Sequence, residues 1–118
     1  MQIIENDFLR ATINTKGAEL SGLQHKQTGI EYIWQADPAF WGKHSPVLFP
    51  VVGALKNNSF LFEGKEYPLG RHGFARDMDF LVVKAGPDSV TFCLEASGAP
   101  LSIFPFLFRF DITYLLKA

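Results

Sequence analysis

The stretch DFLVVKAGPDSVTFCLEA, residues 79–96, decides the fold class of this chain. Two runs rich in β-branched and aromatic residues flank Gly86-Pro87-Asp88, a combination typical of a bend between two strands. The lone cysteine, Cys93, lies in the second run between apolar neighbours, which predicts a buried and unreactive thiol. The stretch therefore predicts an antiparallel hairpin.

The same period-two pattern recurs on both sides of this hairpin. It predicts strands in FLRATINT (8–15), AELSGLQHK (18–26) and LFRFDITYLL (107–116), a hairpin around Glu63-Gly64-Lys65 in SFLFEGKEYPL (59–69), and a Thr28-Gly29 turn before a strand over Ile30–Trp34. Only PAFWGK, residues 38–43, has any helical character. Turn residues follow one another about every ten positions, so the predicted fold class is all-β, an antiparallel β-sandwich.

The last predicted strand runs almost to the C-terminus, with no turn or cap after it. A long apolar strand at the edge of a sheet invites pairing with another strand. We therefore expect further chain or another subunit beside it, and a homodimer through this open edge is one way to cover it.

Composition sets limits on partners and compartment. The chain has 118 residues, 47% of them hydrophobic, and a net charge of −1. Such a chain can bury one core, and it carries no positive field that would attract nucleic acid or an anionic membrane. Residues 1–11 lack a signal-peptide pattern, and one cysteine cannot form an internal disulfide, so we expect a cytoplasmic protein.

The stretch RHGFARD, residues 71–77, gathers one imidazole, two guanidiniums and a carboxylate around Gly73. His72 suits general acid–base chemistry, because an imidazole titrates near neutral pH. Arg76 suits the clamping of hydroxyls or a carboxylate by its fork of donors. The alternative is a loop ion network of Arg71, Arg76, Asp77 and Asp79 with His72 as a spacer.

A second polar group follows HSPVLFPVVGAL, residues 44–55. Pro46 and Pro50 predict an edge strand or an irregular crossing, because proline cannot donate to a central ladder. Lys56 and Asn57 come next, either in a solvated turn or at the rim of a cleft.

Aromatic residues precede both polar groups. Trp34 and Trp41 could stack on the C–H faces of a sugar, whereas core packing is the favoured role for Phe40. His25 and His44 show no metal-ligand spacing with each other or with Cys93, so no metal site is expected.

Taken together, residues 17–77 resemble the N-terminal part of the aldose 1-epimerase (galactose mutarotase) family, and most nearly its LacX-like branch. The motifs that carry the resemblance are LFPVVG (48–53), EGKEYPL (63–69) and HGFAR (72–76), in this order and spacing.

The resemblance implies a large β-sandwich, of which residues 1–118 would be the N-terminal portion. It implies interconversion of the α and β anomers of an aldose, with a carboxylate as base, a histidine as acid and no metal or organic cofactor. By position His72 is similar to the first active-site histidine, with Phe74 where better-known members have a second glycine. Arg76 would bind the substrate, and Lys56 would stand where the family has a sugar-binding arginine.

The same resemblance implies that this chain holds only part of an active site, because the second histidine and the catalytic glutamate belong to the longer C-terminal part. We expect weak or no activity from these residues alone. Two alternatives stay open. One is a non-catalytic carbohydrate-binding sandwich that uses Trp34 or Trp41, Lys56 and Arg76, and the other is an inactive truncated fragment.

Overall fold

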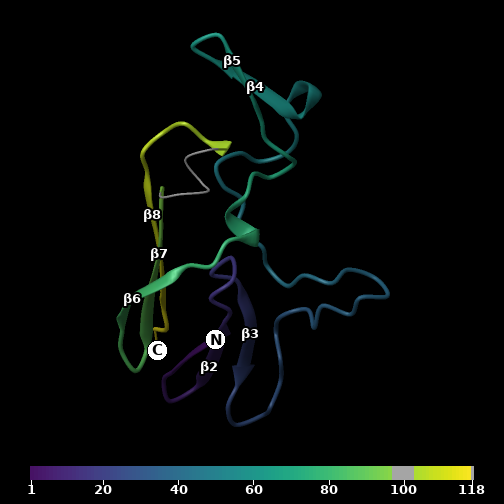
Figure 1. Cartoon of the computed structure of the whole chain (residues 1–118). Coiled ribbons are helices and arrows are strands. Elements are labelled where there is room, and N and C mark those ends of the chain that lie inside the picture. Colours follow the sequence, from purple (N-terminus) through teal and green to yellow (C-terminus); the bar gives the residue numbers. More distant parts are fainter. Residues whose placement is uncertain (97–102, 118) are drawn as a thin grey trace.

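The regular secondary structure is mainly β-strand in the computed structural model, which describes residues 1–96 and 103–117. Its elements are β1 (Gln2–Glu5), β2 (Leu9–Ile13), β3 (Leu20–His25), η1 (Lys56–Asn58), β4 (Ser59–Phe62), β5 (Lys65–Pro68), η2 (Ala75–Asp77), β6 (Leu81–Ala85), β7 (Ser89–Glu95) and β8 (Arg109–Leu115). The strands form three antiparallel sheets, ordered β1-β2-β3, β4-β5 and β6-β7-β8 (Figure 1). The predicted all-β fold class is confirmed.

The two three-stranded sheets share one core. Its fully buried large side chains are Ile4, Ile13, Val90 and Phe92. Burying each such side chain contributes about 1.5–3 kcal/mol, which is why the alternating strands of both sheets turn these faces inward. Two hydrogen bonds also join the layers: the Tyr114 hydroxyl donates to the Ala18 carbonyl at 2.7 Å, and Glu5 N donates to Pro87 O at 2.8 Å. The result is a sandwich built from the ends of the chain.

Both predicted hairpins are confirmed. In the β4–β5 hairpin Glu63 and Gly64 have φ of +50° and +77°, so the turn needs only these two residues and Lys65 already begins β5. Positive φ at both central positions is the geometry of the tight turn that matches strand twist. In the β6–β7 hairpin, Gly86 N donates to Ser89 O at 2.8 Å across the predicted bend.

The predicted strand over Ile30–Trp34 is wrong. Gly29 does turn the chain, with φ +74°, but the returning segment makes only a single bridge, between Gln24 and Glu31. The Glu31 carboxylate accepts hydrogen bonds from the main-chain nitrogens of Leu23 (2.7 Å) and Ile33 (2.9 Å). A side chain thus takes the place of a ladder acceptor, and the strand stops after one residue.

The structure also decides the predictions for residues 38–43 and 44–55. PAFWGK forms a turn rather than a helix: Phe40 N and Trp41 N both donate to Asp37 O, at 3.0 and 2.9 Å. The segment 44–55 is an irregular crossing rather than an edge strand, which confirms one of the two alternatives predicted for it. Its single bridge joins Phe49 and Gly73.

The sheet edges are open. β6 and β8 are the outer strands of their sheet, and every residue of β6 is exposed, including Leu81 at 72%. The Cα radius of gyration is 16.6 Å, compared with about 13 Å for a compact domain of 100 residues. The described residues therefore form an extended layer with much apolar surface uncovered.

The thiol of Cys93 is buried on β7, as predicted. Its exposed fraction is 3%, and burial, together with a hydrogen bond to Asp111, raises its pKa to about 11. The thiolate, which is the nucleophilic form, is therefore scarce at neutral pH. Within the described residues no helix has the length and apolar character to cross a membrane.

Candidate functional site

The loop 71–77 packs on residues 48–53 of the crossing segment through main-chain hydrogen bonds. Phe74 N and Ala75 N both donate to Phe49 O, at 3.0 and 3.1 Å, and His72 N donates to Gly53 O at 2.9 Å. Two motifs that lie about twenty residues apart in the sequence, LFPVVG and HGFAR, thus form one hydrogen-bonded unit. We call these residues, 48–53 and 71–77, the paired-motif unit.

Backbone conformation explains the residues at its centre. Gly73 has φ +71°, and a Cβ at this position would overlap the Phe49 carbonyl, so only glycine fits. His72 also has a positive φ, +65°, which is uncommon for a residue with a side chain. The hydrogen bonds to Gly53 and Phe49 hold this conformation from both sides.

The imidazole of His72 is half-buried and has contacts at both ring nitrogens. Gly53 N donates to Nδ1 at 2.8 Å, and Arg71 Nε lies 3.3 Å from Nε2. The main-chain N–H of His72 also donates to Gly53 O, so Gly53 bonds both the ring and the main chain of His72. The side of the ring that carries Nε2 faces an exposed arginine rather than the core.

Arg76 lies in η2 and folds back on its own loop. Its Nη2 donates to Arg71 O at 3.1 Å, and its Nε is 4.0 Å from the Asp77 carboxylate and makes no hydrogen bond. Asp77 is also 3.8 Å from Lys43 Nζ, but its side chain is 60% exposed. Such long ion pairs with an exposed carboxylate contribute little, so the loop ion network is weak.

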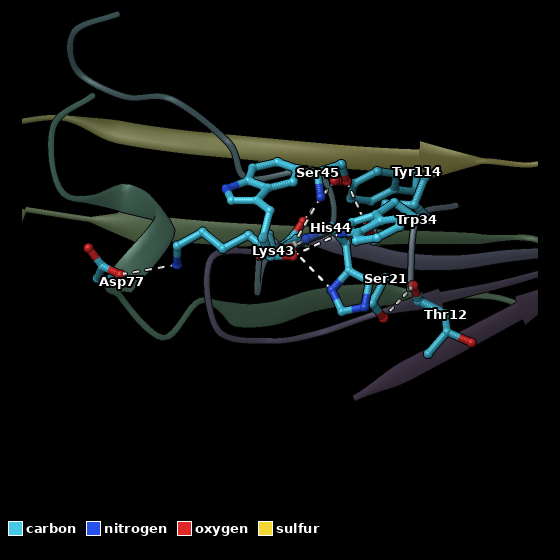
Figure 2. Close-up of polar contacts among 12 residues, drawn as sticks. Thr12, Ser21, Trp34, Lys43, His44, Ser45, Asp77 and Tyr114 are labelled. Atoms are coloured by element: carbon cyan, nitrogen blue, oxygen red, sulfur yellow. Dashed lines mark hydrogen bonds and ion pairs between the residues drawn. The ribbon is translucent and has the colours of Figure 1, made fainter. Parts of the chain in front are cut away.

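A buried carboxylate fixes the loop that carries the tryptophans. Glu19 is 7% exposed, and its Oε1 accepts hydrogen bonds from His44 N (2.6 Å) and Ser45 N (3.1 Å) and lies 3.3 Å from His44 Nδ1. Figure 2 shows His44 and Ser45 in this arrangement, with Lys43 reaching toward Asp77 on the other side. The loop is therefore attached to the start of β3 and approaches η2.

Trp41 lies in this loop, where its main-chain N–H closes a turn on Asp37 O. Its side chain is 51% exposed, and its carbonyl accepts a hydrogen bond from Trp34 Nε1 at 2.9 Å. An exposed indole beside polar groups is suited to stacking on an apolar ligand face.

Lys56 and Asn57 line a separate hollow on the β4–β5 hairpin. It has a volume of about 450 Å³, and its other lining residues are Ser59, Phe60, Leu61 and Glu66. Neither His72, Arg76 nor Trp41 lines it. It connects to the paired-motif unit through the main chain, since Lys56 follows Gly53 by three residues.

The structure therefore distributes the sequence-predicted site residues over three separate places. His72 and Arg76 lie in the paired-motif unit, Lys56 and Asn57 in the hairpin hollow, and Trp41 on the loop anchored by Glu19. Among residues 1–96 and 103–117, no three His, Cys, Asp or Glu side chains are grouped so as to hold a metal ion.

Two positions of this region were not assigned a role from the sequence. Gly53 contacts the His72 ring through its main chain, and Glu19 anchors the tryptophan loop through its carboxylate. The only available signal for Gly53 was a glycine at the end of an apolar run. For Glu19 it was a charged residue just before the apolar residues of a strand.

Comparisons with known proteins agree on one family. The sequence profile described as aldose 1-epimerase matches residues 1–118. The chain is 32% identical over 119 residues to the plasmid-encoded LacX protein of Lactococcus lactis subsp. lactis, a match that covers 97% of this chain and 40% of that protein.

Solved structures agree in fold. A galactose mutarotase related enzyme from Lactobacillus acidophilus is 42% identical, with a TM-score of 0.96 over 98% of this chain and 39% of its own. A galactose mutarotase-like protein from Lactobacillus casei is 39% identical, with a TM-score of 0.94 over 99% of this chain and 40% of its own. The chain thus spans about two fifths of the length of the relatives that it matches.

Proposed function

Because this chain belongs to the aldose 1-epimerase family, we propose that residues 1–118 are the N-terminal portion of a galactose mutarotase-like sandwich that interconverts the α and β anomers of an aldose. The observation that carries the proposal is the paired-motif unit. It holds the half-buried His72 ring by Gly53 at the junction of the two motifs most typical of the resemblance.

The reaction defines what a site must supply. A base removes the proton of the anomeric hydroxyl, the bond between C1 and the ring oxygen breaks, and the ring oxygen gains a proton. Rotation about C1–C2 and the reverse steps then give the other anomer. Acid and base must stand on opposite sides of the anomeric centre, so one imidazole cannot supply both groups.

In this proposal His72 is the catalytic group that this chain contributes, on the side of the sugar that faces the paired-motif unit. Arg76 binds hydroxyls through its guanidinium donors, and Trp41 stacks on a C–H face of the ring. Lys56 and Asn57 bind polar groups at the far end of the sugar, from the hairpin hollow. The reaction needs no metal or organic cofactor.

The second acid–base group lies outside these 118 residues in this account, so the chain alone is weak or inactive. Lack of a positioned acid or base typically costs on the order of a hundred- to ten-thousand-fold in rate.

The proposal also covers compartment and assembly. A cytoplasmic location is supported by the single buried thiol of Cys93, which has no cysteine partner in the chain. The outer edge of β8, seven residues long and without a partner strand among the described residues, is suited to pairing with a second copy, which light scattering would detect as a dimer.

Saturation-transfer NMR of α-glucose and α-galactose tests the function. The chain is measured alone, and again after covalent fusion to the remaining three fifths of the Lactobacillus acidophilus protein, whose matched portion has the same fold. We expect anomer exchange close to that in buffer for the chain alone and strongly enhanced exchange for the fusion.

The His72→Ala variant of the fusion supplies the control. We expect it to fold, by circular dichroism, and to lose the enhancement. Sugar-induced shifts without enhanced exchange would indicate a non-catalytic carbohydrate-binding module instead. A folded fusion that neither binds nor interconverts either sugar, or full exchange in the His72→Ala variant, would refute the proposal.

A further inference from the structure

We infer that the main chain of Gly53 holds the imidazole of His72 as its Nε2–H tautomer, so that the ring offers a hydrogen-bond donor to a sugar oxygen. Gly53 is then a positioning residue for His72. The inference rests on the proposed function only for the identity of the ligand, because the tautomer is a property of the chain itself.

The two contacts between His72 and Gly53 carry the inference. Gly53 N lies 2.8 Å from Nδ1, and Gly53 O accepts the main-chain N–H of His72 at 2.9 Å. A main-chain nitrogen can only donate, so Nδ1 must be the acceptor and carry no proton. A neutral imidazole has one protonated nitrogen, which leaves the proton on Nε2.

Arg71 makes the competing contact. Its Nε lies 3.3 Å from Nε2, but a neutral ring cannot accept hydrogen bonds at both nitrogens. The Gly53 contact is the shorter one and comes from a fixed main-chain donor, whereas the arginine side chain is exposed and free to turn away. The Arg71 guanidinium therefore moves away from Nε2, and the Nε2–H group can donate to an acceptor on a ligand.

The chemistry of the ligand follows from this tautomer. An Nε2–H group binds an atom that presents a lone pair, such as the ring oxygen or a hydroxyl oxygen of an aldose. In the other tautomer Nδ1–H would face the Gly53 N–H donor, and that hydrogen bond would be lost.

Gly53 contributes its backbone conformation rather than its small size. Its φ is +82°, and a Cβ added there would meet no atom within 4 Å. A Cβ at this position would not clash, but a β-branched residue would disfavour the positive φ that aims the N–H at His72. Gly64, in the β4–β5 turn, has φ +77° and is equally open, so it offers a matched control.

The other two histidines provide internal references. Nδ1 of His44 lies 3.3 Å from the Glu19 carboxylate, an arrangement that favours a proton on Nδ1. Nδ1 of half-buried His25 accepts a longer hydrogen bond, 3.2 Å, from Thr28 N. The chain should thus show His72 and His44 with opposite protonation of Nδ1.

Long-range ¹H–¹⁵N correlation NMR of the 118-residue chain at neutral pH tests the inference, with His72→Asn used to assign the signals. We expect Nδ1 of His72 at the position of an unprotonated nitrogen and Nε2 at that of a protonated one, unchanged in Arg71→Ala and in Gly64→Val. In Gly53→Val the two nitrogen signals of His72 should move toward each other, as in a freely exchanging imidazole.

A protonated Nδ1 in the wild-type chain, equal signals from both nitrogens, or an unchanged pattern in Gly53→Val would overturn the inference. These outcomes are independent of activity. If the tautomer is as expected but the fused protein catalyses no anomer exchange, the proposed function fails and the assignment of Gly53 stands.

Discussion

The β6–β7 hairpin and the crossing segment 44–55 are held in place in different ways. The hairpin has a ladder of main-chain pairs and four buried side chains, those of Val90, Phe92, Cys93 and Leu94. The crossing segment makes one bridge, and it depends on hydrogen bonds to the loop 71–77 and to the Glu19 carboxylate. The hairpin therefore depends on an alternating pattern of apolar residues, whereas the crossing segment depends on the identity of individual residues.

The largest effect is expected in the hairpin. The Phe92 side chain is fully buried, so Phe92→Ala should lower the free energy of unfolding by about 3–5 kcal/mol through lost burial and a cavity. Val83→Ala on the open strand β6, where the side chain is 48% exposed, should change it by less than about 0.5 kcal/mol. Urea unfolding measures both, and equal losses would contradict a core centred on β7.

A smaller effect is expected in the paired-motif unit, from a single methyl group. Gly73→Ala adds a Cβ that overlaps the Phe49 carbonyl, whereas Gly64→Ala adds one in open space at a similar positive φ. The Gly64 variant should lose about 1–2 kcal/mol from backbone strain alone, and the Gly73 variant clearly more. Urea unfolding measures both variants. Equal losses in the free energy of unfolding would contradict the close approach of Gly73 to the Phe49 carbonyl.

These two regions also differ in how far the sequence predicts them. Both hairpins could be predicted, because alternating apolar residues and turn residues such as Gly64 and Gly86 are local signals. The Ile30–Trp34 strand was wrong because alternation does not reveal how far pairing extends. Main-chain hydrogen bonds join Ile30 and Tyr32 to β3, but the Glu31 side chain accepts the Leu23 N–H in place of a main-chain carbonyl.

The site could be predicted only in part. The motifs of the resemblance pointed to His72 and Arg76, but no local pattern indicates that the main chain of Gly53 would bond the His72 ring. That contact joins residues nineteen positions apart through irregular backbone. Lys56 and Asn57 lie side by side in one hollow, as their adjacency suggests, but the sequence did not indicate that this hollow lies apart from the residues that surround His72.

The smallest expected effect concerns pH and the buried thiol of β7. Folding raises the pKa of Cys93 from 9.0 to about 11, mainly through burial. The folded state therefore binds this proton more tightly, and its stabilising contribution is complete below pH 9 and lost as the pH rises toward 11.

Unfolding of the wild-type chain and Cys93→Ala should be compared at pH 8 and pH 10.5. The wild type should lose more stability than the variant over this interval, and the thiol should react slowly with a disulfide reagent at pH 8. A parallel loss in both proteins, or rapid modification, would place Cys93 in contact with solvent.

The measurement that most directly tests the central claim, that the two motifs form one hydrogen-bonded unit around His72, is amide hydrogen exchange at Gly53. We expect the Gly53 amide to be protected in the wild-type chain and to exchange much faster in His72→Ala, which removes its acceptor. The Leu69 amide, bonded to Asn58 O at 2.8 Å, should exchange at the same rate in both. Equal exchange of Gly53 in the two proteins would contradict the account.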